Sequence, residues 1–588
     1  MINEKNKENF FFAASNIKKY WSKDHPIIFS GDWCFDYKDD LIRFKSKVIP
    51  YQWSSSQKVI KAQVYCEKIF EEVLKKITND LNKFHNQNHN TKYYRILLGN
   101  WLIHYIHQCY DKYICITEAC KDKDIFTFYI NEVEENIPYD FNEFITSSEK
   151  SEYQIRLFSE LFDEMNLERR KGPRIKLEIN NYKIIKYLSF YTLKNFISNI
   201  TNNIFYVILL SFNYFNKTKI IVINPYFKFR SWRNKILLFI RSRGKIFFFK
   251  PVLKNNFSNT DIKYEFRNSK KEKPNTFNNI AYNLVKRNIP KVYLEYHQEY
   301  CKHVNQFYNF NDSISWLTFQ WSSNTVFHYI AALKHNKSKI FLAQHGVGYG
   351  IDKIHSLEKI ERSVSEKYFT YGWNEGTKTI PLAPPHIKLR STIKRDKKII
   401  LFVSTTRPMH LVRFINGSNS SQNLIDNVEY PIIFFQNCKY KNQIYGRFHE
   451  TDSDRWNNYQ RIIKKFPNLK KNQDETFYES LNRVEMIISD HLGTTFLECL
   501  QANIPIIIFL NKKSYIFRET DNKLIQELVK NKIIFFNPKE AALFVNRKYE
   551  NIDTWWNSNE IQSIRKKLLI KHFNSHKNWI EKWCEILL

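Results

Sequence analysis

Residues 484–509 constrain the fold of this chain more than any other segment. Two short apolar runs, at 486–488 and 506–509, are typical of buried strands, and turn and capping residues lie between them. A helix is expected from about Thr495 to Ala502, because Pro505 cannot continue it. The order strand, tight loop, helix and strand predicts an α/β fold, with the loop at the carboxyl end of a sheet strand.

The loop before that helix has the properties of a phosphate site. The free N–H groups and the dipole of a helix N-terminus favour an anion, so we expect Gly493, Thr494 and Thr495 to bind the phosphates of a nucleotide. Glu498 shares a helix face with Thr495 and leans back toward the loop, where it can accept hydrogen bonds from ribose hydroxyls. The alternative is an ordinary βαβ unit, in which Thr495 caps the helix and Glu498 stabilises its dipole.

A second candidate site follows an expected strand at 339–343. Its sequence is Gln344-His345-Gly346-Val347-Gly348-Tyr349-Gly350, and the three glycines let the backbone approach a ligand closely. His345 is a candidate catalytic residue, because imidazole titrates near neutral pH and can take a proton from an acceptor hydroxyl. Gln344 and Gly346 are assigned to donor binding beside it. The alternative is a structural histidine that orders a glycine turn.

Three more residues belong to the predicted site. Asp490 and His491 form an acid/base pair after the strand at 486–488, so Asp490 is the other candidate catalytic residue and His491 a donor-binding one. The alternative for Asp490 is an acceptor that orders the loop. Arg447 can pair bidentately with a phosphate, unless it is an ordinary surface arginine. No group of His, Cys, Asp and Glu has metal-ligand spacing, so we predict no metal and no cofactor besides a nucleotide-activated substrate.

The length of 588 residues is too great for one hydrophobic core, which implies two or three domains. Apolar residues at helical spacing predict a mainly helical N-terminal region at 1–165, after one opening strand. Alternating strands and helices then predict two Rossmann-like domains with parallel sheets, an acceptor domain at 166–380 and a nucleotide-donor domain at 395–545. A linker is expected at 381–388. The helices at 546–588 are expected to pack back across both domains.

The formal net charge of +32 has three interpretations. We rank a compositional bias toward Lys, Asn, Ile, Phe and Tyr first, an anionic membrane surface second and nucleic acid third. Nine cysteines without a repeated spacing and a polar N-terminus without signal-peptide order favour the cytoplasm. The longest apolar run, at 204–212, is shorter than the ~20 residues of a membrane span. We therefore expect a soluble or peripheral protein.

Residues 490–505 resemble the donor-binding segment of GT-B glycosyltransferases. The matching pattern is Asp490-His491-x-Gly493-Thr494-Thr495-x-Leu497-Glu498, followed by Asn503-Ile504-Pro505, and Kdo transferases and CDP-glycerol glycerophosphotransferases have similar segments. Nearly the whole chain also resembles one bacterial family of transferases associated with O-antigen and other surface-polysaccharide gene clusters. This wider resemblance is carried by Gly31-Asp32-Trp33-Cys34, Trp53, Arg95-Ile96-Leu97-Leu98-Gly99-x-Trp101-Leu102, Tyr293-Leu294-Glu295, the 344–350 segment and Tyr371-Gly372-Trp373.

The resemblance implies a GT-B-like fold, with two Rossmann-like domains facing a cleft, and a metal-independent glycosyltransferase activity. Such an enzyme moves a sugar, or a sugar-like or glycerophosphate group, from a nucleotide-activated donor to a glycan or lipid-linked glycan acceptor of O-antigen, lipopolysaccharide or capsule. It would act in the cytoplasm, in peripheral contact with the anionic inner face of the membrane.

Two other functions stay open on the residues themselves. A nucleotide-sugar epimerase can use the same fold and the same donor site. A basic nucleic-acid-binding protein is less favoured, because the charge is spread along the chain and the Lys/Arg-plus-aromatic recognition signatures are missing. No nucleic-acid partner is therefore expected.

Overall fold

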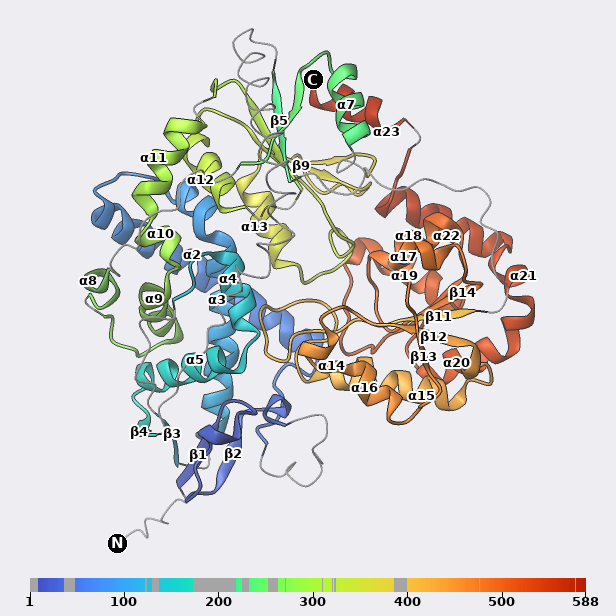
Figure 1. Ribbon diagram of the computed structural model, residues 1–588, viewed down its shortest axis with the longest axis horizontal. Coiled ribbons are helices and arrows are strands. Elements are labelled where there is room, and N and C mark those ends of the chain that lie inside the picture. The colour runs from blue at the N-terminus through green and yellow to red at the C-terminus, as the bar shows by residue number, and fades with distance from the viewer. Residues whose placement is uncertain are drawn as a thin grey trace, which may run out of the picture.

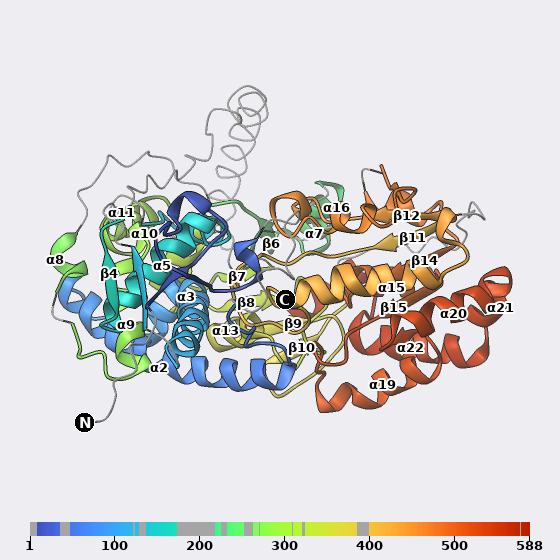
Figure 2. The same ribbon diagram turned by 90° about the horizontal axis from the view of Figure 1, so that it is seen from below.

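Three parallel sheets organise the protein (Figures 1 and 2). The domain predicted at 395–545 forms one side of the molecule, and the N-terminal region together with the first large sheet forms the other. The computed structural model describes residues 9–35, 48–121, 124–128, 137–172, 218–224, 232–251, 263–269, 271–308, 310–319, 321, 324–384, 399–474, 476–576 and 578–588.

The N-terminal region is built around two long helices, α2 (Ser56–His85) and α3 (Thr91–Ala119), which pack against each other. α3 is buried on nearly all sides, because α2, α5 (Ser151–Glu164), α9 (Phe277–Asn288) and α12 (Thr325–Lys334) surround it. The predicted mainly helical character is therefore confirmed.

The N-terminal region also contains a small sheet that the sequence does not predict. Its order is β2-β1-β3-β4, and all neighbours are parallel. The strands are β1 (Asn9–Ala13), β2 (Ile27–Phe29), β3 (Asp124–Phe128) and β4 (Glu168–Arg170). The prediction of a single opening strand corresponds to β2 alone.

The first six-stranded sheet has the order β10-β9-β8-β7-β5-β6, with every pair parallel. Its strands are β5 (Ile220–Ile223), β6 (Ile246–Phe248), β7 (Ser315–Thr318), β8 (Ile340–Ala343), β9 (Lys367–Thr370) and β10 (Thr379–Pro381). All residues of β5 and β8 are buried, as expected of parallel strands covered on both faces. The expected linker begins within β10, and its part from residue 385 onward lies outside the described residues.

The second six-stranded sheet has the order β13-β12-β11-β14-β15-β16 and is also parallel. Its strands are β11 (Ile400–Val403), β12 (Ile444–Arg447), β13 (Lys470–Lys471), β14 (Met486–Ser489), β15 (Ile506–Phe509) and β16 (Ile534–Phe535). The order reverses between β11 and β14, which creates the crevice where open α/β sheets bind ligands. The strands predicted around residues 486–488 and 506–509 are both confirmed.

The C-terminal helices contact both large sheets. α22 (Asn559–His572) packs on α18 (Thr494–Ala502) and α19 (Glu519–Lys530). α23 (Trp579–Leu587) lies beside α7 (Trp232–Arg241) (Figure 1). Trp583 fixes it there, because its ring packs 5.6 Å from Phe319 and 5.4 Å from Phe369 and its Nε1–H donates to the Ala383 carbonyl at 2.8 Å.

The segment after β8 joins the two large domains. Asp352 and Phe517 form an antiparallel bridge, and Arg518 pairs with Glu358 of α13 (Ser356–Val364) at 2.7 Å. The carboxyl ends of the two sheets therefore face a shared region. Two Rossmann-like parallel sheets with a mainly helical N-terminal region form the GT-B-like α/β architecture that the sequence predicts, and this fold class is confirmed.

Candidate functional site

A cavity of about 650 Å³ opens at the carboxyl ends of β11, β12 and β14, beside the start of α18. It lies at the point where the strand order reverses. Five of the predicted donor-binding residues line it together: Arg447, His491, Thr494, Thr495 and Glu498. Those residues come from two separate segments of the chain, the end of β12 and the β14–α18 segment, and the fold brings them into one wall. We call this cavity the switch-point cavity.

The start of α18 leaves its first turn available to a ligand. Gly493 is the N-cap residue, and no side chain among the described residues caps the helix. The first turn also contains no acidic residue. A side chain at Gly493 would place its Cβ 2.8 Å from the ring of His491, so this ring would have to move to accommodate it. The helix N-terminus thus presents unshielded N–H groups and a positive dipole end to the cavity.

Glu498 is a buried carboxyl on the cavity wall. Only 9% of its surface is exposed, and burial raises its pKa to about 7, although Tyr478 partly offsets the shift. The Tyr478 hydroxyl donates to Oε1 at 3.4 Å. Near neutral pH this carboxyl is therefore divided between two states. The ionised state accepts hydrogen bonds at both oxygens, which suits a pair of sugar hydroxyls.

Nucleotide binding is expected to strengthen as pH rises through about 7, because Glu498 ionises there. Glu498→Gln should weaken binding at pH 8 by about tenfold or more, as hydrogen bonds to charged groups contribute about 1.5–3 kcal/mol. It should also lose the pH dependence. Isothermal titration calorimetry at pH 6 and pH 8 measures both effects, with Glu519→Gln as an exposed acidic control. Equal affinity in wild type and Glu498→Gln would remove the ribose assignment.

Asp490 does not face the cavity, which corrects its assignment as a catalytic base. Its Oδ1 accepts from the Thr405 N–H at 3.2 Å and lies 2.9 Å from Nδ1 of His491, and its Oδ2 accepts from the Ser404 hydroxyl. The side chain is fully buried. Asp490 therefore links the end of β14 to the end of β11 and orders the loop, which is the alternative that the sequence leaves open.

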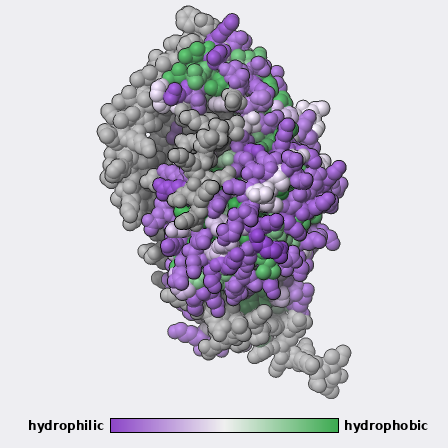
Figure 3. Space-filling model, turned by 90° about the vertical axis from the view of Figure 1, so that its right-hand side faces the viewer, coloured by the Kyte–Doolittle hydropathy of each residue, from purple (hydrophilic) through white to green (hydrophobic). Residues whose placement is uncertain are grey.

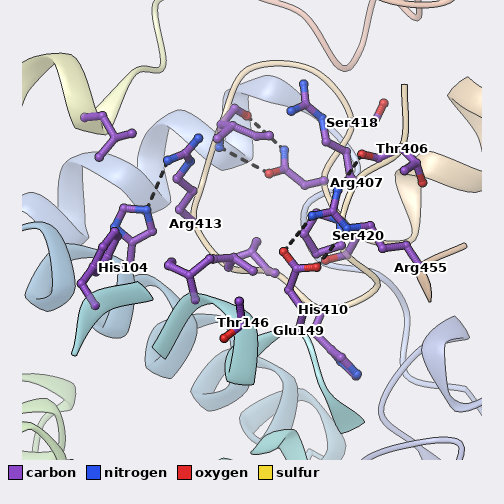
Figure 4. Close-up of a pocket in the computed structure, with 18 of the residues that line it drawn as sticks. His104, Thr146, Glu149, Thr406, Arg407, His410, Arg413, Ser418, Ser420 and Arg455 are labelled. Atoms are coloured by element: carbon purple, nitrogen blue, oxygen red, sulfur yellow. Dashed lines mark hydrogen bonds and ion pairs between the residues drawn. The ribbon is translucent and has the colours of Figure 1, made fainter. Parts of the chain in front are cut away.

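A smaller cavity of about 450 Å³ lies next to the switch-point cavity (Figure 4). Ser404 and Thr405 line the larger cavity and Thr406 and Arg407 the smaller one, so the two share the segment that follows β11. The rest of its wall comes from α3, from α4 (Phe141–Ser148) and its C-terminal end, from residues 408–420, and from Leu357 and Arg455. We call it the arginine cavity.

Three arginines line the arginine cavity, and only one has a carboxylate partner among the described residues. Arg455 forms a bidentate pair with Glu149 at 2.8 and 2.9 Å, as Figure 4 shows. Arg413 contacts the ring of His104 at 3.3 Å, and burial lowers its pKa. Nε of Arg407 is buried without a hydrogen-bond partner. Because two guanidinium groups stay uncompensated, the cavity is suited to an anion.

Neighbouring acids do little to neutralise this charge. Burial raises the pKa of Glu361 to about 8 and that of Asp352 to about 7, and the charges of Arg413 and Arg407 respectively act in the opposite direction. Both carboxyls are thus substantially protonated near neutral pH. His410, on the cavity wall, is buried with neither ring nitrogen hydrogen-bonded in the described part of the chain. These unsatisfied groups indicate a site that a polar, negatively charged group completes.

Within the described part of the chain, His345 lines neither of the two cavities. Its Nδ1 is 3.2 Å from the Tyr349 hydroxyl, which donates to Glu361 at 3.2 Å. Burial, then the charge of Arg413, lowers the pKa of His345 to about 4, while a hydrogen bond to the Phe319 backbone opposes the shift. The imidazole is therefore neutral at pH 7. Its role as a base stays a prediction that needs a rearrangement of these hydrogen bonds.

Gln344 has a structural role, which corrects its assignment to donor binding. Its Oε1 accepts from the indole of Trp373 at 2.8 Å and from the Tyr371 N–H at 3.0 Å, and its Nε2 donates to the Gly346 carbonyl at 2.8 Å. The side chain is buried and shapes the glycine segment. Gly346 itself has open space around it, because its nearest neighbour to an added Cβ is Tyr349 at 4.0 Å.

The residues of the arginine cavity were not predicted from the sequence. Arg407 follows the buried strand β11 by four residues, and the rule that ligands bind beyond strand carboxyl ends would have selected it. No comparable signal marks Arg413, Glu149 or His104. They meet only because α3 and α4 fold against the segment after β11.

Residues 10–587 match the family described as LIC12162 family transferase. No curated protein matches the chain. The fold resembles HepE from Anabaena, solved with UDP and glucose, at 11% identity and a TM-score of 0.35 over 63% of this chain and 99% of HepE. It also resembles the wall teichoic acid polymerase TagF, solved with CDPG, at 11% identity and a TM-score of 0.29 over 68% of this chain and 96% of TagF. MnaA from S. aureus, solved with UDP, is similar at 8% identity and a TM-score of 0.33 over 62% of this chain and 94% of MnaA.

Proposed function

We propose that this chain, which belongs to the LIC12162 family of transferases, moves a sugar or a sugar-like group from a nucleotide-activated donor to a glycan acceptor. The transferred group can also be a glycerophosphate. The acceptor is a growing surface polysaccharide, such as O-antigen or capsule, free or linked to lipid. The main support for the proposal is that five predicted donor-binding residues line the switch-point cavity together: Arg447, His491, Thr494, Thr495 and Glu498.

The two cavities divide the donor between them. The nucleoside occupies the switch-point cavity, with its ribose at Glu498 and its phosphates at Thr494 and Thr495. The phosphate next to the transferred group then points toward the shared segment at Thr405 and Arg407. Arg407 and Arg413 stabilise the negative charge that develops on the leaving nucleotide, because fixed positive groups in a water-poor cavity act strongly on such charge.

In the reaction the bond between the donor group and its phosphate oxygen breaks, and the electron pair stays with the nucleotide. The acceptor hydroxyl oxygen forms the new bond, and its proton leaves to a base. His345 is the proposed base, since its low pKa keeps it unprotonated at neutral pH. Because nucleotide-activated donors are made inside the cell, we propose that the reaction takes place in the cytoplasm.

Transfer is expected to continue in the presence of EDTA, because Arg407, Arg413 and the α18 N-terminus supply the positive charge that a metal would supply. The described residues also contain no group of three or more His, Cys, Asp or Glu suited to a metal ion. The transfer rate is measured with the chelator in about fivefold excess over metal. It is measured again after Mg²⁺ or Mn²⁺ is restored. A rate that falls with chelator and returns with metal would contradict this expectation.

The proposed function is tested by nucleotide release from CMP-, CDP-, UDP- and GDP-linked donors with purified glycan acceptors. A transferase releases nucleotide in step with a mass increase of the acceptor. A nucleotide-sugar epimerase, which the sequence alone leaves open, instead changes the donor's stereochemistry without an acceptor. Acceptor-independent isomerisation with no increase in acceptor mass would therefore overturn the proposal.

A further inference from the structure

Helix α7 exposes an unusual amount of apolar surface. Four of the eleven exposed large apolar side chains of the described residues lie on this ten-residue helix: Trp232 at 70%, Ile236 at 46%, Leu237 at 44% and Ile240 at 62%. Contiguous apolar surface of this kind marks interaction sites on folded proteins. Figure 3 shows a hydrophobic area at the end of the molecule where Figure 1 places α7 and α23.

The exposed side chains share one face of α7. Trp232, Ile236 and Ile240 follow each other at intervals of four residues, and Leu237 lies next to them. Leu238, on the opposite face, is fully buried in a cluster with Ile246 and Trp583. The helix is therefore anchored to the protein by one apolar face while a second apolar face points outward.

The surroundings of this face are strongly basic. Residues 232–250 contain six Lys and Arg and no Asp or Glu: Arg233, Lys235, Arg241, Arg243, Lys245 and Lys250. All of these cations are exposed except Lys235, which is half-buried. The neighbouring helix α23 carries acids, and there Glu581 approaches Arg241 at 3.9 Å and Glu585 is exposed. The wider sequence continues the pattern, because 14 Lys and Arg and no acidic residue lie between Glu178 and Asp261.

We propose that α7 docks the protein on an anionic lipid membrane. The apolar face enters the interfacial layer, with Trp232 at the headgroup level, and the flanking cations contact anionic headgroups. Charge complementarity favours this occupant over a second copy of the chain, since two such basic surfaces would repel each other. No helix within the described ranges is long and apolar enough to cross a membrane, so this contact lies at the surface.

The docking surface goes beyond the transfer reaction and does not depend on it. It would explain part of the net charge of +32 as a lipid-binding surface around α7, which the composition alone does not do. It would also hold the first large sheet, to which α7 belongs, toward the lipid.

Vesicle co-sedimentation tests the proposal. The full chain should bind vesicles of phosphatidylcholine with about 30% phosphatidylglycerol at low salt, bind pure phosphatidylcholine weakly, and dissociate as salt rises. Trp232→Glu/Ile240→Glu should reduce the partition coefficient by about tenfold or more, since it removes apolar contacts and adds like charge. Val64→Glu/Leu543→Glu is the matched control, because both residues are exposed on other helices, and it should bind like wild type.

Three outcomes would overturn the proposal. The first is failure of wild type to bind the anionic vesicles at low salt, and the second is equal binding by the α7 variant. The third is a wild-type dimer in light scattering that becomes a monomer in the α7 variant, which would make this face an interface between copies. Nucleotide binding by the α7 variant is measured in parallel and should be unchanged, so loss of lipid binding is distinguished from misfolding and from failure of the transferase assignment.

Discussion

Arg413→Gln is expected to lower kcat/KM for transfer by about 10²–10³-fold, the usual cost of removing one group that stabilises developing charge. The guanidinium lines the arginine cavity, and its Nη1 contacts Nε2 of His104 at 3.3 Å. Its charge is thus available to the leaving phosphate. Steady-state kinetics with saturating acceptor measures the effect, and the loss should appear mainly in kcat.

A surface arginine provides the control for this variant. Arg483 pairs with Asp474 at 3.0 Å, and its side chain is 66% exposed. Arg483→Gln should keep the wild-type rate within about twofold, because exposed ion pairs contribute little. If Arg413→Gln also stays within this range, the anion assigned to the arginine cavity does not bind there during the reaction.

His345→Ala is expected to reduce kcat by about 10²–10⁴-fold, the typical contribution of general base catalysis. Nucleotide affinity should change little, because the imidazole does not line the switch-point cavity. With a pKa of about 4, His345 stays unprotonated from pH 5 upward. The wild-type rate should therefore show no loss of this base between pH 8 and pH 6, and an acid limb should appear only near pH 4.

Tyr349→Phe separates the two roles that His345 can have. The Tyr349 hydroxyl joins His345 to Glu361, so its removal disturbs the orientation of the ring but leaves the base in place. We expect a smaller loss of kcat than in His345→Ala. If His345→Ala costs less than about tenfold, or no more than Tyr349→Phe does, the histidine only orders the glycine segment.

The fold of the domain at 395–545 could be predicted well because its signals are local. Residues 486–488 and 506–509 are uninterrupted apolar runs, and Pro505 together with Gly493 marks the two ends of α18. The general rule for strand carboxyl ends then placed Thr494, Thr495 and Glu498 around one cavity. The rule fixes where a residue lies but not where its side chain points. Asp490 turned inward because Ser404 and the Thr405 N–H offered it donors at the end of β11.

The small N-terminal sheet could not be predicted because its strands lack a strand-like pattern. β4 consists of Glu168, Arg169 and Arg170, none of them apolar, and it becomes a strand only by pairing with β3. β3 itself is five residues long and follows a charged run. Strand formation here depends on a neighbour that is distant in sequence.

The arginine cavity depends on long-range contacts that no local pattern encodes. Residues 404–421 contain no helix or strand, and the N-terminal region sets their path. The Phe414 N–H donates to Nδ1 of His107 at 3.2 Å, and the Tyr51 hydroxyl donates to the Asn419 carbonyl at 2.7 Å. These partners are separated by about 300 residues or more. The sequence therefore marks the nucleotide cavity but not the charged cavity beside it.

The most direct test of the central claim is the thermal stability of the full chain with CMP, CDP, UDP and GDP and with their sugar-linked forms. At least one of these ligands should raise the Tm, since a ligand at about 100 times its Kd adds about 2.7 kcal/mol to the free energy of unfolding. The increase should shrink in Glu498→Gln at pH 8 and persist in Glu519→Gln. The absence of a shift with every nucleotide, or the same shift in all three proteins, would contradict a nucleotide-activated donor in the switch-point cavity.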